Sequence, residues 1–471
     1  MEHKRGNFSG GLGFVFAAAG SAVGLGNLWR FPYLAAKYGG GIFIFVYIIL
    51  AVTFGFALLT AEIAIGRKTQ LSPILAYKKL DKRFSFIGYL ATLVPIIIIP
   101  YYCVIGGWVT KYMTAYATAL FDPSLVSALA DKNTDSSYFV DFIGSPVAPL
   151  IFFLIFMLIS VLIIMLGVEK GIEKISKILM PVLLLLTIGI SIYVLTIPNA
   201  MEGVAKYLVP DFGKYATMSF GDAASELILT VAAALGQLFF SMSIAMGIMV
   251  TYGSYTRKEV NLTKSVNQIE IFDTVVALLA GLMVVPSVYI FSGAEGLSSG
   301  GPGLMFMTLP KVFEQMPAGG IVALLFFVLV FLAAITSSIS VMEAIVSSLM
   351  DKFKIKRMTG CLIVIGICIL MGVPASLGNG LWSHIQILGM DFLTFFDYLS
   401  NSVLMPIVAL CTCILIGWVI KPKAISDEVT RNGEKFGRKK LFNVMIKYVA
   451  PIFLVVILVS YTLAQFGIIK M

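Results

Sequence analysis

The sequence predicts an all-α integral membrane protein, and three observations support that class. Of the 471 residues, 59% are hydrophobic and only 13% are charged, which is about half the charged fraction of a soluble protein. The mean hydropathy is +0.96. Segments 147–167 and 180–197 contain no charged residue and are long enough to cross the hydrocarbon core as helices. A single soluble core is therefore excluded.

The apolar segments predict eleven membrane-spanning helices. Cytoplasmic loops retain Lys and Arg, and 26 of the 34 basic residues lie at the N-terminus or in the even-numbered connections. This asymmetry predicts a multi-pass protein of the inner (plasma) membrane, with a cytoplasmic N-terminus and an external C-terminus. The expected helices are 11–37, 42–66, 87–120, 147–167, 172–197, 224–253, 267–294, 320–350, 358–378, 395–420 and 444–468.

Composition also excludes several functions. The net charge is +9, but the basic residues are spread over short loops, which argues against nucleic acid as a partner. The five cysteines lie in apolar segments without a CxxC pair, and the two histidines are far apart. We therefore expect neither a metal centre of the Cys/His type nor an enzyme. The lipid bilayer is the expected partner, and nothing predicts an obligatory protein partner.

The first span contains an anomaly at residues 20–27, Gly-Ser-Ala-Val-Gly-Leu-Gly-Asn. Glycine is unfavourable in a helix because it loses much entropy there, and Asn is a poor helix former. Backbone unwinds at membrane depth only where it lines a cavity or is buried in protein. Close helix packing through small residues is the alternative explanation.

The sixth span contains a second anomaly, because Gln237, Ser241, Ser243 and Gly247 interrupt its apolar sequence. The first and sixth spans occupy corresponding positions if the fold repeats after five helices. Paired interruptions of this kind indicate a transporter binding site at the bilayer midplane. Half-helix N-termini there donate N–H groups to an anion, and freed carbonyls ligate a cation.

Several side chains inside the spans carry the oxygen ligands that a hard cation requires. Asp273 is the most informative, since an intramembrane carboxylate is costly and indicates function. Glu62, Gln237 and Glu343 are instead expected to brace the broken helices. An amino acid carboxylate beside a sodium ion suits such a site. The candidate oxygen donors are Asn27, Ser241, Asp273, Thr336 and Ser337.

These segments resemble the neurotransmitter:sodium symporter family over nearly the whole chain. Bacterial members are mostly sodium-coupled amino acid importers, and eleven spans are common among them. The stretches that carry the resemblance are 20–33 (GSAVGLGNLWRFPY), 39–41 (GGG), 100–102 (PYY), 237–243 and 333–338 (AAITSS).

The resemblance implies a 5+5 inverted-repeat helical bundle with discontinuous first and sixth helices and one extra C-terminal helix. Residues 1–197 would form the first repeat with helices 1 to 5. Residues 198–420 would form the second repeat with helices 6 to 10. Residues 421–471 would hold a cytoplasmic loop and helix 11.

The resemblance also implies two sodium sites and a substrate site, residue by residue. The first sodium site would use the Ala22 carbonyl, Asn27, Ser241, Asp273 and the substrate carboxylate. The second would use the carbonyls of Gly20, Val23 and Ala333 with the hydroxyls of Thr336 and Ser337. The substrate carboxylate would meet the amides of Leu25 and Gly26 and the Tyr102 hydroxyl, and the amino group would meet the carbonyls of Ala22, Phe240 and Ser241. The side-chain pocket would be lined by Ile98, Tyr102, Phe240, Ser243, Met246, Ser337 and Val341.

Gates follow from the same resemblance. Tyr102 and Phe240 would form the outer lid with Arg30 and Asp397 above it, and Arg5 and Asp351 would pair on the cytoplasmic side. These closing elements argue against a channel.

Two positions bear on the transported solutes. Asp273 stands where animal members have asparagine beside a chloride ion, so we expect transport that does not require chloride. Met246 is adaptable and apolar, which favours a neutral hydrophobic or aromatic amino acid. A transporter of the same fold for another small amine or amino acid derivative is the alternative. Amine transporters carry an aspartate at the position of Gly24, so amino acids are favoured.

Overall fold

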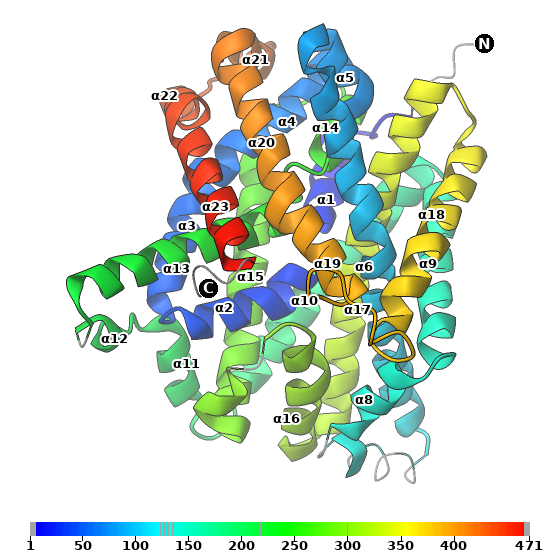
Figure 1. Cartoon of the computed structure of the whole chain (residues 1–471), viewed down its shortest axis with the longest axis vertical. Coiled ribbons are helices and arrows are strands. Elements are labelled where there is room, and N and C mark those ends of the chain that lie inside the picture. Colours follow the sequence, from blue (N-terminus) through cyan, green and yellow to red (C-terminus); the bar gives the residue numbers. More distant parts are fainter. Residues whose placement is uncertain are drawn as a thin grey trace.

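The computed structural model describes residues 6–122, 125, 129, 131–133, 136–216, 218–298 and 300–465. In these residues every secondary-structure element longer than an isolated bridge is a helix (Figure 1). Ten helices are long and apolar enough to cross a membrane, and α1 with residues 26–37 forms an eleventh span bent by 51°. The predicted number of spans agrees with this description.

The first five spans follow the expected ranges. Short helices that the sequence analysis treated as loops accompany them: α5 begins with a proline, which is favoured in the first turn, and packs on α6. The bounds are α1 Gly11–Ala22, η1 Gly26–Arg30, α2 Phe31–Lys37, α3 Gly41–Leu50, η2 Ala51–Gly55, α4 Phe56–Thr69, α5 Pro73–Leu80, η3 Lys82–Phe84, α6 Ser85–Ala119, α8 Ser137–Gly144, α9 Ala148–Met165, η4 Val168–Glu173 and α10 Lys174–Leu195.

The second half of the chain contains six further spans and more short helices. In Figure 1, α5, α21 and α22 lie at one end of the molecule, and α8, α11 and α16 lie at the other. The bounds are α11 Ala200–Leu208, α12 Gly213–Ala216, α13 Phe220–Ser241, α14 Ile248–Tyr255, α15 Leu262–Gly296, η5 Leu304–Thr308, α16 Leu309–Gln315, α17 Gly319–Phe353, α18 Arg357–Leu377, α19 Phe392–Asp397, η6 Tyr398–Leu404, α20 Met405–Ile414, η7 Leu415–Val419, α21 Lys423–Val429, α22 Lys439–Val444, η8 Met445–Val449 and α23 Ala450–Gln465.

Both predicted breaks are present. Val23 is extended, with φ −76° and ψ 99°, and it ends α1. In the sixth span α13 ends at Ser241 and α14 begins at Ile248, with positive φ at Ser243 (53°), Ala245 (64°) and Gly247 (69°) between them. Such backbone is unfavourable for residues with a Cβ and is held only where the surroundings impose it.

Buried polar side chains hold the non-helical backbone at the two breaks, as the sequence analysis predicted. The Glu62 carboxylate (Oε1), from α4, accepts a hydrogen bond of 2.7 Å from the backbone N–H of Ala245. The Gln237 amide (Nε2), from α13, donates one of 3.0 Å to the carbonyl of Gly26. Each broken helix is therefore secured at membrane depth by a side chain from another element.

The Glu62 contact predicts a stability difference between two variants. Glu62→Ala leaves the buried Ala245 N–H without its acceptor and is expected to reduce the free energy of unfolding by about 1–3 kcal/mol. Glu62→Gln keeps an acceptor oxygen and should melt close to the unmodified protein. Thermal unfolding in detergent measures both, and equal melting temperatures for the two variants would contradict the bracing role.

Candidate functional site

The two breaks face each other across a central cavity of about 20 Å³. Every residue of the predicted substrate-binding site except Leu25 lines this cavity. Leu25 lines an outer vestibule instead. The central cavity also includes Ser21 and Gly24. The lining residues are Ser21, Ala22, Gly24, Gly26, Asn27, Ile98, Tyr102, Phe240, Ser241, Ser243, Met246, Ser337 and Val341.

A buried carboxylate lies beside this cavity. Asp273 Oδ1 accepts hydrogen bonds from the Asn27 side-chain amide (2.8 Å) and the Ser241 hydroxyl (2.6 Å), and its Oδ2 accepts one from the Tyr47 hydroxyl (3.2 Å). These residues come from α15, η1, α13 and α3, and all are buried. The three partners are neutral, so they do not neutralise a charge on this carboxylate, and a charge in such a buried place is favourable only when it is paired or bound to a cation. The cluster therefore suits a small hard cation.

Tyr47 was missed by the sequence analysis, because a tyrosine in an apolar span is ordinary in sequence. Only its position opposite Asp273 shows its role.

A second oxygen-rich cluster lies where unwound α1 meets α17. The Ser337 hydroxyl (Oγ) lies 3.2 Å from the Ser21 carbonyl and 3.4 Å from those of Gly20 and Val23. The Thr336 hydroxyl donates to the Ala333 carbonyl at 3.1 Å. The residues predicted for the second sodium site therefore lie close together in the structure.

Tyr102 places a hydroxyl in the cavity. This hydroxyl is buried and has no hydrogen-bond partner among the described residues, although buried polar groups are almost always paired. A Cβ at Gly24 would lie 3.3 Å from it and only 2.7 Å from the Ser337 hydroxyl. A Cβ at Gly26 would lie 2.6 Å from the Phe240 ring. Glycine is thus required for the close approach of the unwound backbone to these side chains.

Ser243 connects the two breaks directly. Its hydroxyl lies 2.9 Å from the Ser21 hydroxyl and donates to the Ser21 carbonyl at 3.0 Å. Ser21 was not predicted as a site residue, although its place among three glycines in the first break is a usable signal.

The outer vestibule has a volume of about 510 Å³ and includes Arg30 and Asp397. The Asp397 carboxylate (Oδ1) accepts hydrogen bonds from the Asn401 side chain (2.6 Å) and the Tyr101 hydroxyl (3.1 Å). Among the residues that the structure describes, Arg30 and Asp397 line the same vestibule without forming a direct ion pair. Tyr101 and Asn401 were not predicted.

Side chains of α14, α17 and α18 form a packed polar cluster around Glu343. The Tyr255 hydroxyl and the Arg357 guanidinium both donate to the Glu343 carboxylate, at 2.6 Å and 2.7 Å. The backbone N–H of Phe8 donates to the Tyr255 carbonyl at 3.1 Å. Asp351 accepts from the Ser72 N–H at 2.8 Å. Its predicted partner Arg5 lies outside the described residues.

Two broken helices, oxygen clusters beside the breaks and a cavity between them are typical of one class of protein, the membrane transporters with discontinuous helices. The family profile of the Sodium:neurotransmitter symporter family matches residues 5–123 and 132–470. The chain belongs to this family and is a sodium-dependent membrane transporter.

Individual relatives agree with this assignment. An uncharacterised sodium-dependent transporter of Haemophilus influenzae is 33% identical over 97% of this chain and 98% of its own. The sodium-dependent transporter YhdH of Bacillus subtilis, also uncharacterised, is 35% identical over 98% of both chains. The sodium- and chloride-dependent taurine transporter of Rattus norvegicus is 26% identical over 88% of this chain and 71% of its own.

The crystal structure of MhsT in complex with L-phenylalanine has the same fold. It superposes with a TM-score of 0.84 and 33% identity, covering 97% of this chain and 100% of that one. This similarity confirms the predicted fold class.

Proposed function

We propose that this chain is a sodium-coupled symporter that imports a neutral, hydrophobic or aromatic amino acid by alternating access. The observation that carries the proposal is the buried Tyr102 hydroxyl, which faces the unwound backbone at Gly24 and has no hydrogen-bond partner among the described residues. A carboxylate suits both the hydroxyl and the N-terminal amides of the half-helix. The apolar side chains of Ile98, Met246 and Val341 form the rest of the wall.

Two sodium ions are proposed for the two oxygen clusters. The first would bind Asp273, Asn27 and Ser241, next to the substrate carboxylate, so each ligand raises the affinity of the other. The second would bind where the carbonyls of the first break meet Thr336 and Ser337. Asp273 supplies a fixed negative charge, and we propose that transport therefore needs no chloride.

The remaining expectations enter the same proposal. Arg30 and Asp397 would close the outer vestibule once Asp397 exchanges a present partner for the guanidinium. The even-numbered connections would face the cytoplasm, with the protein in the plasma membrane. The segments 1–197, 198–420 and 421–471 would act as two inverted repeats and an appended helix.

Thermal stability of the purified protein tests the proposal. We expect a sodium-dependent rise in melting temperature with one or more of the twenty amino acids, largest for the hydrophobic or aromatic ones, with N-methylglucamine as the control cation. Taurine and γ-aminobutyrate are tested alongside the amino acids, because the alternative substrate is an amino acid derivative. Proteoliposomes should then accumulate the same amino acid under an inward sodium gradient. No sodium-dependent shift with any amino acid would overturn the proposal.

The second sodium site predicts a further difference. Thr336→Val keeps the shape of the side chain but removes one oxygen ligand, so sodium affinity is expected to fall about tenfold, or about 1.4 kcal/mol. Ser338→Ala is the matched control, since that hydroxyl contacts Ser160 at 2.7 Å instead. Sodium titration of thermal stability compares them, and equal midpoints would contradict the assignment.

A further inference from the structure

A polar groove of about 410 Å³ lies outside the central pathway, where α15 begins next to the segment that precedes α22. No part of the proposed transport site reaches it. Its lining residues are Asn261, Thr263, Lys264, Asn267, Gln268, Ile271 and Lys435.

One face of α15 changes from polar to apolar along this groove. Lys264, Gln268, Ile271 and Val275 follow the spacing that places side chains on one helix face, and all four are exposed. Ile271 is 62% exposed and Val275 is 41% exposed. An exposed face that passes from a lysine to bare aliphatic side chains marks the boundary between lipid headgroups and hydrocarbon.

The groove contains positive charge without an internal counter-charge. Lys264 and Lys435 form no ion pair with any described residue. The nearby carboxylate of Glu270 is bound by both guanidinium nitrogens of Arg438, at 3.1 Å and 2.8 Å. Glu434, next to Lys435, accepts from the backbone and side chain of Asn432.

The groove also contains an unsatisfied donor. The hydroxyl oxygen of Thr263 is buried and has no hydrogen-bond partner among the described residues. A phosphate oxygen in the groove would accept from this hydroxyl and from the two lysines, and charge-assisted bonds of this kind are the strong ones.

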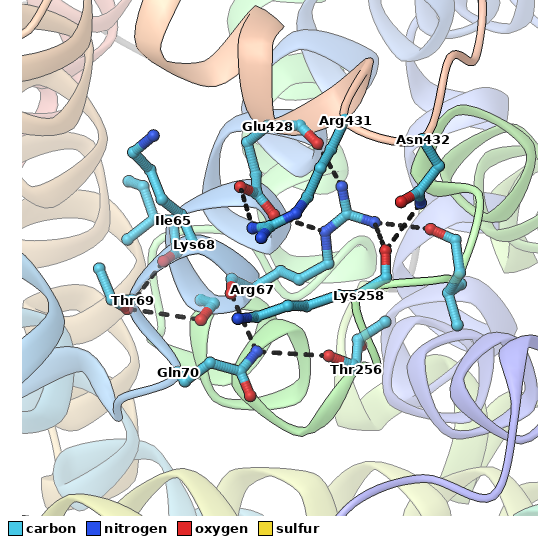
Figure 2. Close-up of polar contacts among 12 residues, drawn as sticks. Ile65, Arg67, Lys68, Thr69, Gln70, Thr256, Lys258, Glu428, Arg431 and Asn432 are labelled. Carbon is cyan, nitrogen blue, oxygen red and sulfur yellow. Dashed lines mark hydrogen bonds and ion pairs between the residues drawn. The ribbon is translucent and has the colours of Figure 1, made fainter.

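A buried ion pair holds the wall that carries Lys435. Arg67, which is fully buried, donates from Nε to the Glu428 carboxylate at 2.8 Å and from Nη1 to the Val260 carbonyl at 2.6 Å. The Asn432 side chain donates to the Lys258 carbonyl at 2.7 Å. Figure 2 shows Glu428, Arg431 and Asn432 gathered over Arg67 and Lys258. The segment before Lys435 is therefore tied to the turn that leads into α15, so the groove is formed in advance of any ligand.

We propose that this groove binds the headgroup of an anionic phospholipid. Lys264 and Lys435 contact the phosphate, the Thr263 hydroxyl donates to it, and an acyl chain follows Ile271 and Val275. Basic pockets at the ends of membrane helices recognise such headgroups. The inference is independent of the solute that the central cavity carries.

The test uses the full-length protein in neutral detergent with added phosphatidylglycerol or phosphatidylcholine. We expect phosphatidylglycerol to raise the melting temperature more, and native mass spectrometry to show it retained. In the double variant Lys264→Gln/Lys435→Gln, at least half of the phosphatidylglycerol-specific shift should be lost. The control Lys78→Gln/Lys82→Gln removes two exposed charges from α5 and η3, outside the groove, and should keep the shift.

Three outcomes would overturn the proposal. If both double variants lost the same share of the phosphatidylglycerol-specific shift, the shift would arise from general attraction to surface charge and not from the groove. Equal stabilisation by inorganic phosphate, added as a separate probe, would assign the groove to a free anion. Equal stabilisation by phosphatidylglycerol and phosphatidylcholine would show that the groove does not select an anionic headgroup. In every arm, a retained sodium-dependent shift with the transported amino acid shows that the variant is folded.

Discussion

Asp273→Asn is expected to lower sodium affinity by 100-fold or more in chloride-free buffer. The substitution preserves the shape of a side chain that contacts Asn27, Ser241 and Tyr47, but it removes the only charge in the cluster. Removing one partner of a buried charge pair typically costs about 3–5 kcal/mol, and each 1.4 kcal/mol is tenfold in affinity. Sodium titration of thermal stability in gluconate buffer measures the change.

Chloride distinguishes the role of this charge from a purely structural one. In Asp273→Asn, chloride should restore part of the sodium affinity because a bound anion replaces the lost charge, whereas the unmodified protein should titrate identically in chloride and gluconate. Asp141→Asn removes an exposed carboxylate and is the control. Wild-type sodium affinity for Asp273→Asn in gluconate would contradict the assignment, and chloride-dependent uptake by the unmodified protein would contradict chloride independence.

Tyr102→Phe is expected to weaken amino acid binding by about 10- to 100-fold while leaving the fold intact. The buried hydroxyl has no partner among the described residues, so its removal breaks no internal hydrogen bond. A hydrogen bond to a charged carboxylate is worth about 1.5–3 kcal/mol, and this sets the expected loss. Competition with a radiolabelled amino acid at saturating sodium measures the affinity.

The adjacent tyrosine provides the matched control. Tyr101→Phe removes a hydroxyl that donates to Asp397 at 3.1 Å, in the outer vestibule, so it should alter amino acid affinity far less than Tyr102→Phe. An unchanged affinity in Tyr102→Phe, or a drop in melting temperature equal to its loss of binding, would show that the hydroxyl supports structure and not substrate.

Residues that conflict with their surroundings could be interpreted from the sequence. Glycines and Asn27 inside an apolar span, a serine-rich interruption at 241–247 and a carboxylate at Asp273 are each unfavourable in hydrocarbon. Both breaks and the cluster around Asp273 were therefore predictable. The eleven apolar segments were predictable for the same reason, since hydropathy reports burial in lipid directly.

Contacts between unremarkable residues depended on the tertiary structure. Tyr47 and Tyr101 carry no local signal, and their roles arise because distant helices bring them to Asp273 and Asp397. The short helices α5, α8 and α16 escaped prediction because helices of this length depend on packing against the spans, α6, α9 and α17 respectively.

The same division applies to charged residues. Asp397 and Arg30 share a vestibule, yet the carboxylate is bonded to Asn401, four residues along the chain, and to Tyr101, 296 residues away. No pattern in the sequence indicates that Tyr101 and not Arg30 is the distant partner. Arg67 belongs to a basic loop in sequence but is fully buried against Glu428, 361 residues away. The free-energy cost of placing a polar or charged residue in hydrocarbon is a property of that residue, so it can be predicted from the sequence. The hydrogen-bond partner of such a residue depends on which helix surfaces the folded bundle brings within bonding distance.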